Sequence, residues 1–199
     1  PTTAQHVQGE FDADLLILDG GPCTVGIEST IIDCTRGEPV LLRPGAITRE
    51  QVQAVCGLPV RSKDELAEPA PRASGTLESH YAPTAKVQLM TAFELQSAID
   101  AYALNANVKT GASAAGTSAV VGTVAVWSCS PVQLPEASAA LFQWQPMPLS
   151  AHDCAHQLFA QLRDFDAQGV AYIWVEAPPQ SPEWDGVRDR LTRASAPTR

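Results

Sequence analysis

AVVGTVAVW, at residues 119–127, is the stretch of the sequence that decides the fold. Its apolar character is nearly continuous rather than alternating, as in a strand whose two faces are both covered. Such strands are typical of parallel sheets that carry helices on both sides. VAYIWVE at residues 170–176 has the same character, and further strands are predicted within AKVQLM (85–90) and LFQWQPM (141–147).

Helical patterns separate these predicted strands. AFELQSAIDAYAL, at residues 92–104, is a predicted helix. Ser150 opens a second helix, in which apolar residues recur at helical spacing until Gly169 ends it. A final helix is predicted from about Pro182 onward. Strands that alternate with helices predict a small, doubly wound, Rossmann-like α/β domain over residues 85–199. No GxGxxG fingerprint follows its strands, so a dinucleotide site is not predicted there.

Residues 1–57 predict a separate, mixed α/β part built on a sheet. Its short strands are expected at residues 15–18, 25–33 and 40–43, with turns between them. Thr48 and Gln51 form a capping box, which predicts a helix that ends at Gly57. Residues 58–84 contain four prolines and no sustained period, so they are expected to form a linker or an extended arm.

The composition limits the kinds of protein that the chain can be. The 199 residues carry a net charge of −9 with only 13 Lys and Arg, so a surface that neutralises nucleic-acid phosphates is not expected. No apolar run approaches the roughly 20 residues that span a bilayer, and no signal-peptide pattern opens the chain. We therefore expect a cytoplasmic, globular protein that binds neither nucleic acid nor membrane. The five cysteines lack a CxxC pair and are expected to be reduced.

Polar residues occupy the second predicted strand and the end of the third. Alternation along the second strand would place Ser29 on one face and Glu28 and Thr30 on the other. A half-exposed sheet face in water would explain this pattern. Alternatively, hydroxyls on a rigid strand hold a small polar ligand. Arg43 suits either a surface ion pair or a planar contact with a carboxylate or phosphate.

Two other kinds of site fit the residues less well. Ser29 does not lie in a GxSxG elbow and His80 lies in the predicted linker, so a Ser/His/Asp hydrolase is weakly supported. His152 and His156 are one helical turn apart, a spacing that can hold a metal ion. The HExxH glutamate and a third ligand are missing from this pattern, and a solvated helix face is the simpler interpretation.

Three motifs in a fixed order carry a resemblance to a known family. They are DGGPCTVGIESTIIDCT (19–35), VLLRPGAIT (40–48) and ASGTLESHYAPTAKV (73–87), and the helix and strand over residues 151–179 add to them. Together they resemble the Sua5 family of threonylcarbamoyl-AMP synthases. That family joins a YrdC-type catalytic domain, through a linker, to a smaller Sua5 domain. The resemblance implies that residues 1–57 are the last part of the YrdC-like domain, 58–84 the linker and 85–199 the Sua5 domain.

The resemblance also implies a reaction and a set of site residues. The family makes threonylcarbamoyl-adenylate from L-threonine, bicarbonate and ATP, and releases pyrophosphate, in the first step toward the t6A modification of tRNA. Ser29 matches a threonine contact, Arg43 and Tyr81 match ATP contacts, and Glu28, Thr30 and His80 are neighbouring, supporting residues. Mg²⁺ is expected with ATP, without a nameable protein ligand, and the downstream t6A transferase machinery is a possible partner.

Two hypotheses of different classes remain open at this point. In the first, the chain is a C-terminal portion of the synthase, inactive alone, because other basic and threonine-binding residues of the family would lie upstream. In the second, the chain is a noncatalytic nucleotide- or partner-binding module that acts as a lid or a regulator.

Overall fold

A computed structural model describes residues 2–11, 14–66, 73, 83–111 and 122–196 of the chain. Its larger part is a four-stranded sheet formed by β4 (Lys86–Met90), β5 (Val124–Ser128), β6 (Phe142–Pro146) and β7 (Tyr172–Glu176). The strand order is β4-β7-β5-β6, and all three strand pairs are parallel. The parallel sheet predicted from the continuous apolar runs is therefore confirmed.

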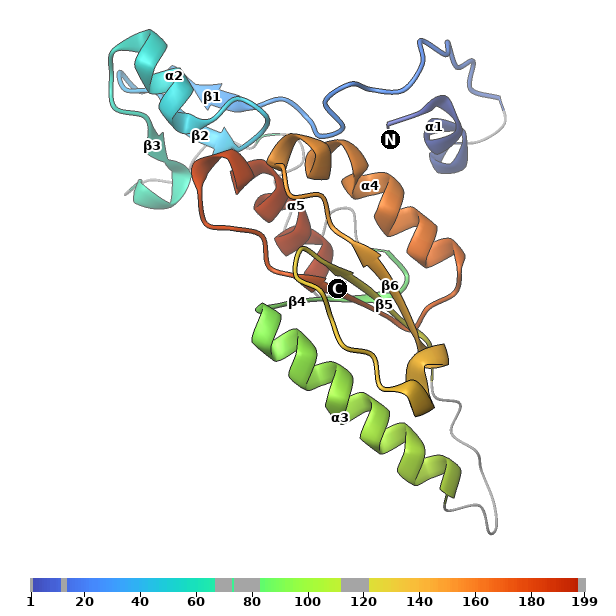
Figure 1. Ribbon diagram of the computed structural model, residues 1–199. Coiled ribbons are helices and arrows are strands. Elements are labelled where there is room, and N and C mark those ends of the chain that lie inside the picture. The colour runs from blue at the N-terminus through green and yellow to red at the C-terminus, as the bar shows by residue number, and fades with distance from the viewer. Residues whose placement is uncertain (1, 12–13, 67–72, 74–82, 112–121, 197–199) are drawn as a thin grey trace.

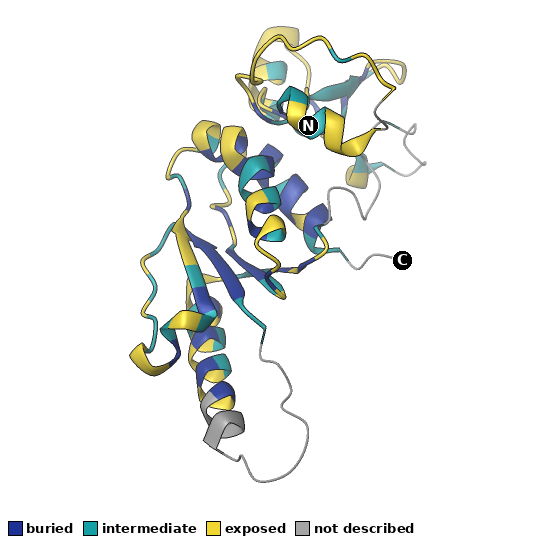
Figure 2. Cartoon of the chain, turned by 90° about the vertical axis from the view of Figure 1, so that its right-hand side faces the viewer, coloured by how far each residue is buried: buried dark blue, intermediate teal, exposed yellow. Residues whose placement is uncertain are grey.

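Helices cover both faces of this sheet. α3 (Ala92–Gly111) lies on one face, whereas α4 (Ala151–Ala167) and α5 (Asp185–Ser195) lie on the other (Figure 1). Short 3₁₀ turns, η2 (Glu136–Leu141) and η3 (Pro182–Trp184), precede β6 and α5. Figure 2 shows that buried residues concentrate in the sheet and in the helices packed on it. The arrangement is doubly wound, as the alternation of strands and helices predicts.

Side chains of the central strand β5 alternate between two hydrophobic cores. Val124 and Val126 pack with Ile99 of α3. Ala125 and Trp127 belong to the opposite core, which α4 and α5 share. All five residues have no exposed surface. Because both faces of β5 are covered, residues 124–127 can all be apolar, and this explains their continuous apolar run.

The core beneath α3 contains a group of aromatic rings around Tyr102. Its ring meets Phe142, Tyr172 and Trp174 edge-on, with ring centroids 5.9, 6.2 and 5.5 Å apart. Its hydroxyl donates a hydrogen bond of 2.7 Å to the carbonyl oxygen of Gly122. Burial raises the pKa of the Tyr102 phenol, so the ring remains a neutral hydrogen-bond donor there.

The smaller part of the molecule is a mixed sheet of β1 (Ile31–Asp33), β2 (Val40–Arg43) and β3 (Arg61–Ser62). β1 and β2 are antiparallel, and β2 and β3 are parallel. α2 (Arg49–Cys56) begins at the capping box of Thr48 and ends at Gly57, whose φ is 70°. These local signals are confirmed, because capping and a left-handed C-terminal residue are encoded within a few positions of the sequence.

Several sequence expectations for this part are wrong. Residues 15–18 form no strand, and Leu16 and Leu18 are 84% and 87% exposed. The strand expected at residues 25–33 is limited to β1. At its expected start, Gly26 has a φ of 82°, which an extended strand does not allow. α1 (Ala4–Glu10) is a helix that the sequence patterns did not indicate.

The predicted linker contributes to the first sheet. β3 and a 3₁₀ turn, η1 (Lys63–Glu65), fall inside residues 58–84, and β3 pairs with β2. His80 and Tyr81 lie outside the described residues. Within the part of the chain that the structure describes, no helix combines the length and apolar character needed to cross a membrane.

The burial of Cys154 on α4 gives a test of the fold. All five cysteines are free thiols, and Cys23, Cys34 and Cys56 are exposed. Burial raises the pKa of the Cys154 thiol to about 12, so it stays protonated in the folded protein at ordinary pH. We expect iodoacetamide, between about pH 7 and pH 9, to alkylate the three exposed thiols while Cys154 reacts only after unfolding. Peptide mass mapping with and without urea measures this. Rapid labelling of Cys154 in the native protein would contradict the packing of α4 against the sheet.

Candidate functional site

Ser29 lies two residues before β1, beside Arg43 at the end of β2. The Arg43 side chain is buried, with 6% of the residue exposed. Its Nε and Nη2 atoms donate hydrogen bonds of 3.2 and 3.0 Å to the backbone carbonyl oxygen of Ser29. The structure therefore brings together the two residues that the family resemblance matches to threonine and ATP contacts. We call residues 28–30 and 43–45 the polar wall.

Thr30 and Gly45 fix the backbone of the polar wall. The Thr30 hydroxyl donates a hydrogen bond of 2.7 Å to the carbonyl oxygen of Ile47, so it closes the turn after β2. A Cβ atom on Gly45 would lie only 2.8 Å from the carbonyl oxygen of Glu28, so only glycine fits this position without a backbone shift. The two segments of the wall are thus packed backbone against backbone.

Glu28 is engaged in an ion pair with α5. Arg190 donates from Nε and Nη2 to the Glu28 carboxylate atom Oε2 at 3.0 and 2.9 Å, and from Nη2 to the Glu28 carbonyl oxygen at 3.3 Å. Arg190 is 1% exposed, whereas the Glu28 side chain is 33% exposed. The predicted supporting residue Glu28 therefore joins the polar wall to the doubly wound domain.

Two glycines bring the wall and its flanks into close contact with α4 and α5. A Cβ atom on Gly26 would lie 2.5 Å from the Ala155 carbonyl oxygen of α4. A Cβ atom on Gly186 of α5 would lie 2.7 Å from Ile27 Cδ1 and 2.9 Å from the Gly45 carbonyl oxygen. Side chains at either position would force the helices away. The small sheet and the second domain therefore meet with little space between their backbones.

The carboxylates near the wall already have partners. Asp33 accepts hydrogen bonds from the backbone and the hydroxyl of Thr35 and pairs with Arg36 at 3.1 Å. These bonds, led by the Thr35 hydroxyl, hold the pKa of the Asp33 carboxyl below its usual value. Glu28 is held by Arg190. Among the described residues, no group of three or more His, Cys, Asp or Glu side chains is arranged to bind a metal ion. The wall as described does not fit a protein-held Mg²⁺.

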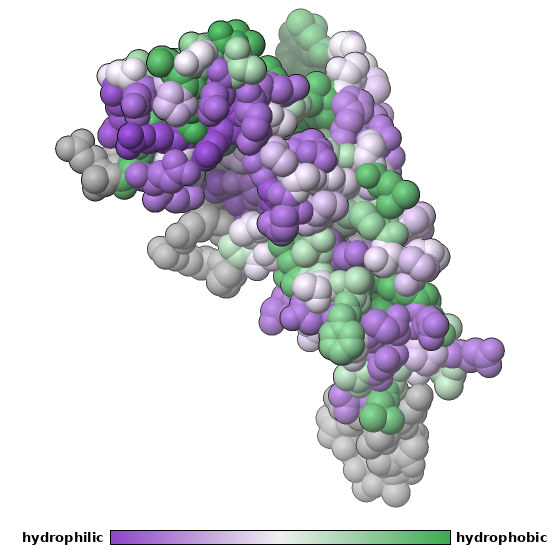
Figure 3. All heavy atoms as spheres, turned by 60° about the vertical axis from the view of Figure 1, so that its left-hand side comes forward, coloured by the Kyte–Doolittle hydropathy of each residue, from purple (hydrophilic) through white to green (hydrophobic). Residues whose placement is uncertain are grey.

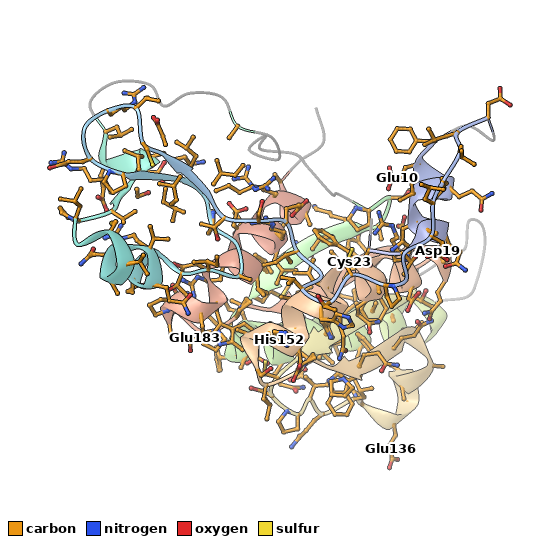
Figure 4. The ribbon with its side chains drawn as sticks, turned by 90° about the horizontal axis from the view of Figure 1, so that it is seen from above. Glu10, Asp19, Cys23, Glu136, His152 and Glu183 are labelled. Carbon is orange, nitrogen blue, oxygen red and sulfur yellow. The ribbon has the colours of Figure 1, made fainter. Side chains whose placement is uncertain are left out.

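The structure adds no ligand to the predicted His152 and His156 pair and no partner to the Ser/His/Asp hydrolase hypothesis within the described residues. His152 is exposed at the start of α4, and its Nδ1 atom lies 3.3 Å from the Asp153 carboxylate. Figure 4 labels His152, whose side chain belongs to this outer helix end. His80, the histidine of the hydrolase reading, is outside the described residues. The solvated helix face remains the simpler interpretation of the His152 region.

A cavity of about 810 Å³ lies between β2, η1 and α5. Its charged lining includes Arg49, Lys63, Asp64, Arg188, Asp189 and Arg193. Arg193 pairs with Asp189 at 2.7 Å, and Arg188 pairs with Asp185. Figure 3 shows that hydrophilic residues predominate on the upper part of this side of the molecule. Because residues of both charges line the cavity, it offers a polar surface without a single dominant sign.

Arg190 is the residue of the site that sequence reasoning missed. Its helix was predicted, but its role was not, because its partner Glu28 is 162 residues away in the sequence. One signal was present. Val187, Leu191 and Ala194 form the buried stripe of α5, and Arg190 lies on the same helical face. An arginine within an apolar stripe indicates a buried ion pair.

The fold and site together define the class of protein. It is a two-part α/β protein, in which a small mixed sheet bearing a polar wall rests on a doubly wound domain. Residues 47–196 match the family described as threonylcarbamoyl-AMP synthase, C-terminal domain, and residues 1–45 match the family described as telomere recombination. The chain belongs to the threonylcarbamoyl-AMP synthase (Sua5) family.

Two relatives named threonylcarbamoyl-AMP synthase are similar along almost the whole chain. The one from Schizosaccharomyces pombe is 32% identical in an alignment of 204 positions that covers 98% of this chain and 49% of the relative. The one from Bacillus subtilis is 32% identical in an alignment of 200 positions that covers 98% of this chain and 53% of the relative. The chain therefore spans about half the length of these relatives.

Solved structures of Pyrococcus abyssi Sua5 have the same fold. The crystal structure described as complexed with L-threonine is 27% identical, with a TM-score of 0.73, over 98% of this chain and 54% of that one. A variant of the same protein gives a TM-score of 0.74 at 26% identity, with 98% and 53% covered. These matches support the α/β architecture, including the Rossmann-like second domain.

The contact of Gly26 with α4 can be tested against a matched glycine. Gly26 and Gly37 have nearly equal φ values, 82° and 83°, but a Cβ atom on Gly37 would have no atom within 4 Å. We expect Gly37→Ala to lower the free energy of unfolding by about 1 kcal/mol, the cost of the left-handed backbone alone. Gly26→Ala should lower it by about 2 kcal/mol more, because the methyl group collides with α4. Urea unfolding of both variants measures the difference, and equal losses would mean that Gly26 does not contact α4.

Proposed function

We propose that a protein carrying this chain is a threonylcarbamoyl-AMP synthase, which converts L-threonine, bicarbonate and ATP into threonylcarbamoyl-adenylate and pyrophosphate. The names of the two relatives and the threonine complex of Pyrococcus abyssi Sua5 support this proposal. Because this chain spans about half of those relatives, the complete reaction needs a catalytic part beyond the residues described.

The observation that carries the proposal is the hydrogen-bonded pair of Ser29 and Arg43. The buried Arg43 guanidinium keeps a positive charge beside Ser29 on a rigid backbone. A threonine carboxylate or carbamate bound at Ser29 would meet a favourable electrostatic potential there, and so would the phosphates of ATP. One wall can thus bring the nucleophile and the nucleotide together, which lowers the entropic cost of their reaction.

The remaining assignments rest on the family resemblance. Tyr81 contacts ATP from the linker, and His80 supports it, so that the linker covers the reacting groups and excludes water. Exclusion of water matters because both the carbamate and the acyl-adenylate hydrolyse easily. Mg²⁺ would accompany the ATP phosphates, and no step is assigned to it because the described carboxylates do not fit a metal site. The reaction belongs in the cytosol, where the t6A machinery takes up the product.

Arg43→Ala tests the site directly. In a protein that carries the chain with a complete catalytic domain, we expect threonine- and bicarbonate-dependent release of pyrophosphate from ATP to fall at least about a hundredfold. The physical reason is that the variant loses both the buried charge and the two hydrogen bonds that hold Ser29.

Arg61→Ala is the matched control in the same sheet. Arg61 of β3 forms an ion pair with Glu38 at 2.8 Å, with about half of each side chain in solvent. Loss of such an exposed pair costs little, and turnover should stay near that of the wild type. Unchanged turnover in Arg43→Ala would remove Arg43 from the site, and equal losses in both variants would point to instability of the sheet.

The 199-residue chain alone distinguishes the enzyme from a noncatalytic module. We expect no threonine-dependent release of pyrophosphate from it, because the rest of the nucleotide site is contributed by the remainder of the catalytic domain. Isothermal titration with ATP, run beside the turnover assay, separates binding from catalysis. Robust turnover by the chain alone would mean that the site is already complete, whereas inactivity of the longer protein as well would favour the lid or regulatory module.

A further inference from the structure

Arg190 links the second domain to both segments of the polar wall. Beyond its bonds to Glu28, its Nη1 atom donates to the carbonyl oxygen of Pro44 and to the Asp189 carboxylate, the latter at 3.1 Å. Glu28 directly precedes Ser29, and Pro44 directly follows Arg43. A single guanidinium thus holds the chain neighbours of both predicted substrate contacts.

The position of the Arg190 side chain is itself fixed by the packing of α5. Arg190 lies on α5 between Val187 and Leu191, which are buried in the core of the doubly wound domain with 1% and 0% exposed. Asp189 also accepts two hydrogen bonds from Arg193, at 3.0 and 2.7 Å, so its carboxylate cannot turn away. A planar side chain that donates from every nitrogen is confined to one orientation. Its carbonyl and carboxylate partners are therefore confined as well.

The hydrogen bonds around the wall form a connected set. Arg43 donates to the Ser29 carbonyl, while Arg190 donates to the carbonyl oxygens of the residues on either side of that pair, Glu28 and Pro44. Gly186 allows α5 to approach the Gly45 carbonyl at the same point. A displacement of α5 would therefore disturb the backbone beside Ser29 and beside Arg43 at the same time.

We propose that Arg190 is a positioning residue for the threonine and ATP site, through which the second domain sets the geometry of Ser29 and Arg43. This inference rests on the proposed function. The second domain then acts on the reaction without touching a substrate. Displacements of about 1 Å in substrate-contacting residues can reduce reaction rates as much as a hundredfold. Effects of this size are therefore expected when the hydrogen bonds of Arg190 are lost.

Arg190→Met tests the proposal in the protein with a complete catalytic domain. We expect the KM for threonine to rise by about tenfold or more, while kcat at saturating threonine changes less, because binding energy must now order the wall. Arg190→Lys should recover part of the affinity, since an ammonium group can pair with Glu28 but cannot also bridge to Pro44. A purely structural defect would instead reduce the amount of active enzyme, and so lower kcat with an unchanged KM.

Arg163→Met is the matched control. Arg163 of α4 also joins the second domain to the first part of the chain, through an ion pair of 2.8 Å with Glu10 of α1. Figure 4 shows Glu10 on the side of the molecule away from β1 and β2. We expect Arg163→Met to leave the KM for threonine unchanged. Equal KM values for the wild type, Arg190→Met and Arg163→Met would overturn the proposal.

Hydrogen exchange gives a readout that does not depend on turnover. In the 199-residue chain, amides of residues 28–30, 43 and 45 should exchange about tenfold faster in Arg190→Met than in the wild type or in Arg163→Met. Glu28→Gln removes the charge of the other partner of the ion pair and should show the same change, so it replaces Arg190→Met if that variant does not fold. Unchanged exchange in both Arg190→Met and Glu28→Gln would overturn the proposal that Arg190 positions the polar wall. A wild-type protein without threonine-dependent turnover would overturn the proposed function, and exchange alone would then decide whether Arg190 orders the wall.

Discussion

Arg190 places a positive charge where almost no water reaches it, and oxygen atoms from two other segments of the chain close around that charge. Removing one partner of such a buried pair typically costs about 3–5 kcal/mol, a large share of the roughly 5–15 kcal/mol that stabilises a domain. Replacing the whole pair with apolar groups is often neutral or stabilising. Stability alone therefore does not explain why this position carries an ion pair. Its specific effect is geometric, because it fixes where Glu28 and Pro44 lie.

The doubly wound domain provides the rigidity that this contact requires. β5 and β7 are the two inner strands of the sheet, and helices cover them on both faces. α5 contributes Val187, Leu191 and Ala194 to that core, so the helix cannot shift without disturbing close packing. The small sheet, by contrast, has three short strands, and most residues of the neighbouring helix α2 and of the loops around the sheet are exposed (Figure 2). Order in the polar wall is therefore supplied largely by the helices against which it rests.

The sequence predicts those elements whose signals are local or are repeated along the chain. The capping box at Thr48 and the continuous apolar strands are of this kind, because each acts through neighbouring residues or through complete burial. Residues 15–18 show the limit of such reasoning, since an apolar run becomes a strand only when a partner strand is present. The strand expected from residue 25 onward begins only at Ile31, and at its expected start the backbone of Gly26 turns against α4.

In the candidate site, too, the sequence predicts what short motifs encode and misses contacts between distant segments. The family motifs indicate Ser29 and Arg43, and the structure brings the two residues into contact. Alternation along a strand predicts a sheet-face position for Glu28, whereas its carboxylate is held by Arg190 of α5, 162 residues further along the chain. Contacts of this length leave no periodic trace in the sequence. They can be suspected only from a charged residue within an apolar stripe, such as Arg190 on α5.

The strand order has a consequence for how the protein is made. β7 separates β4 from β5 in space but follows both of them in the chain. During synthesis, β5 can pair with β6, but β4 has no strand partner and one edge of β5 stays open until β7 emerges and inserts between them. α5 is synthesised later still, so the polar wall gains its hydrogen bonds to Arg190 only at the end of synthesis. The order of emergence thus delays a rigid binding surface until the scaffold that supports it has assembled.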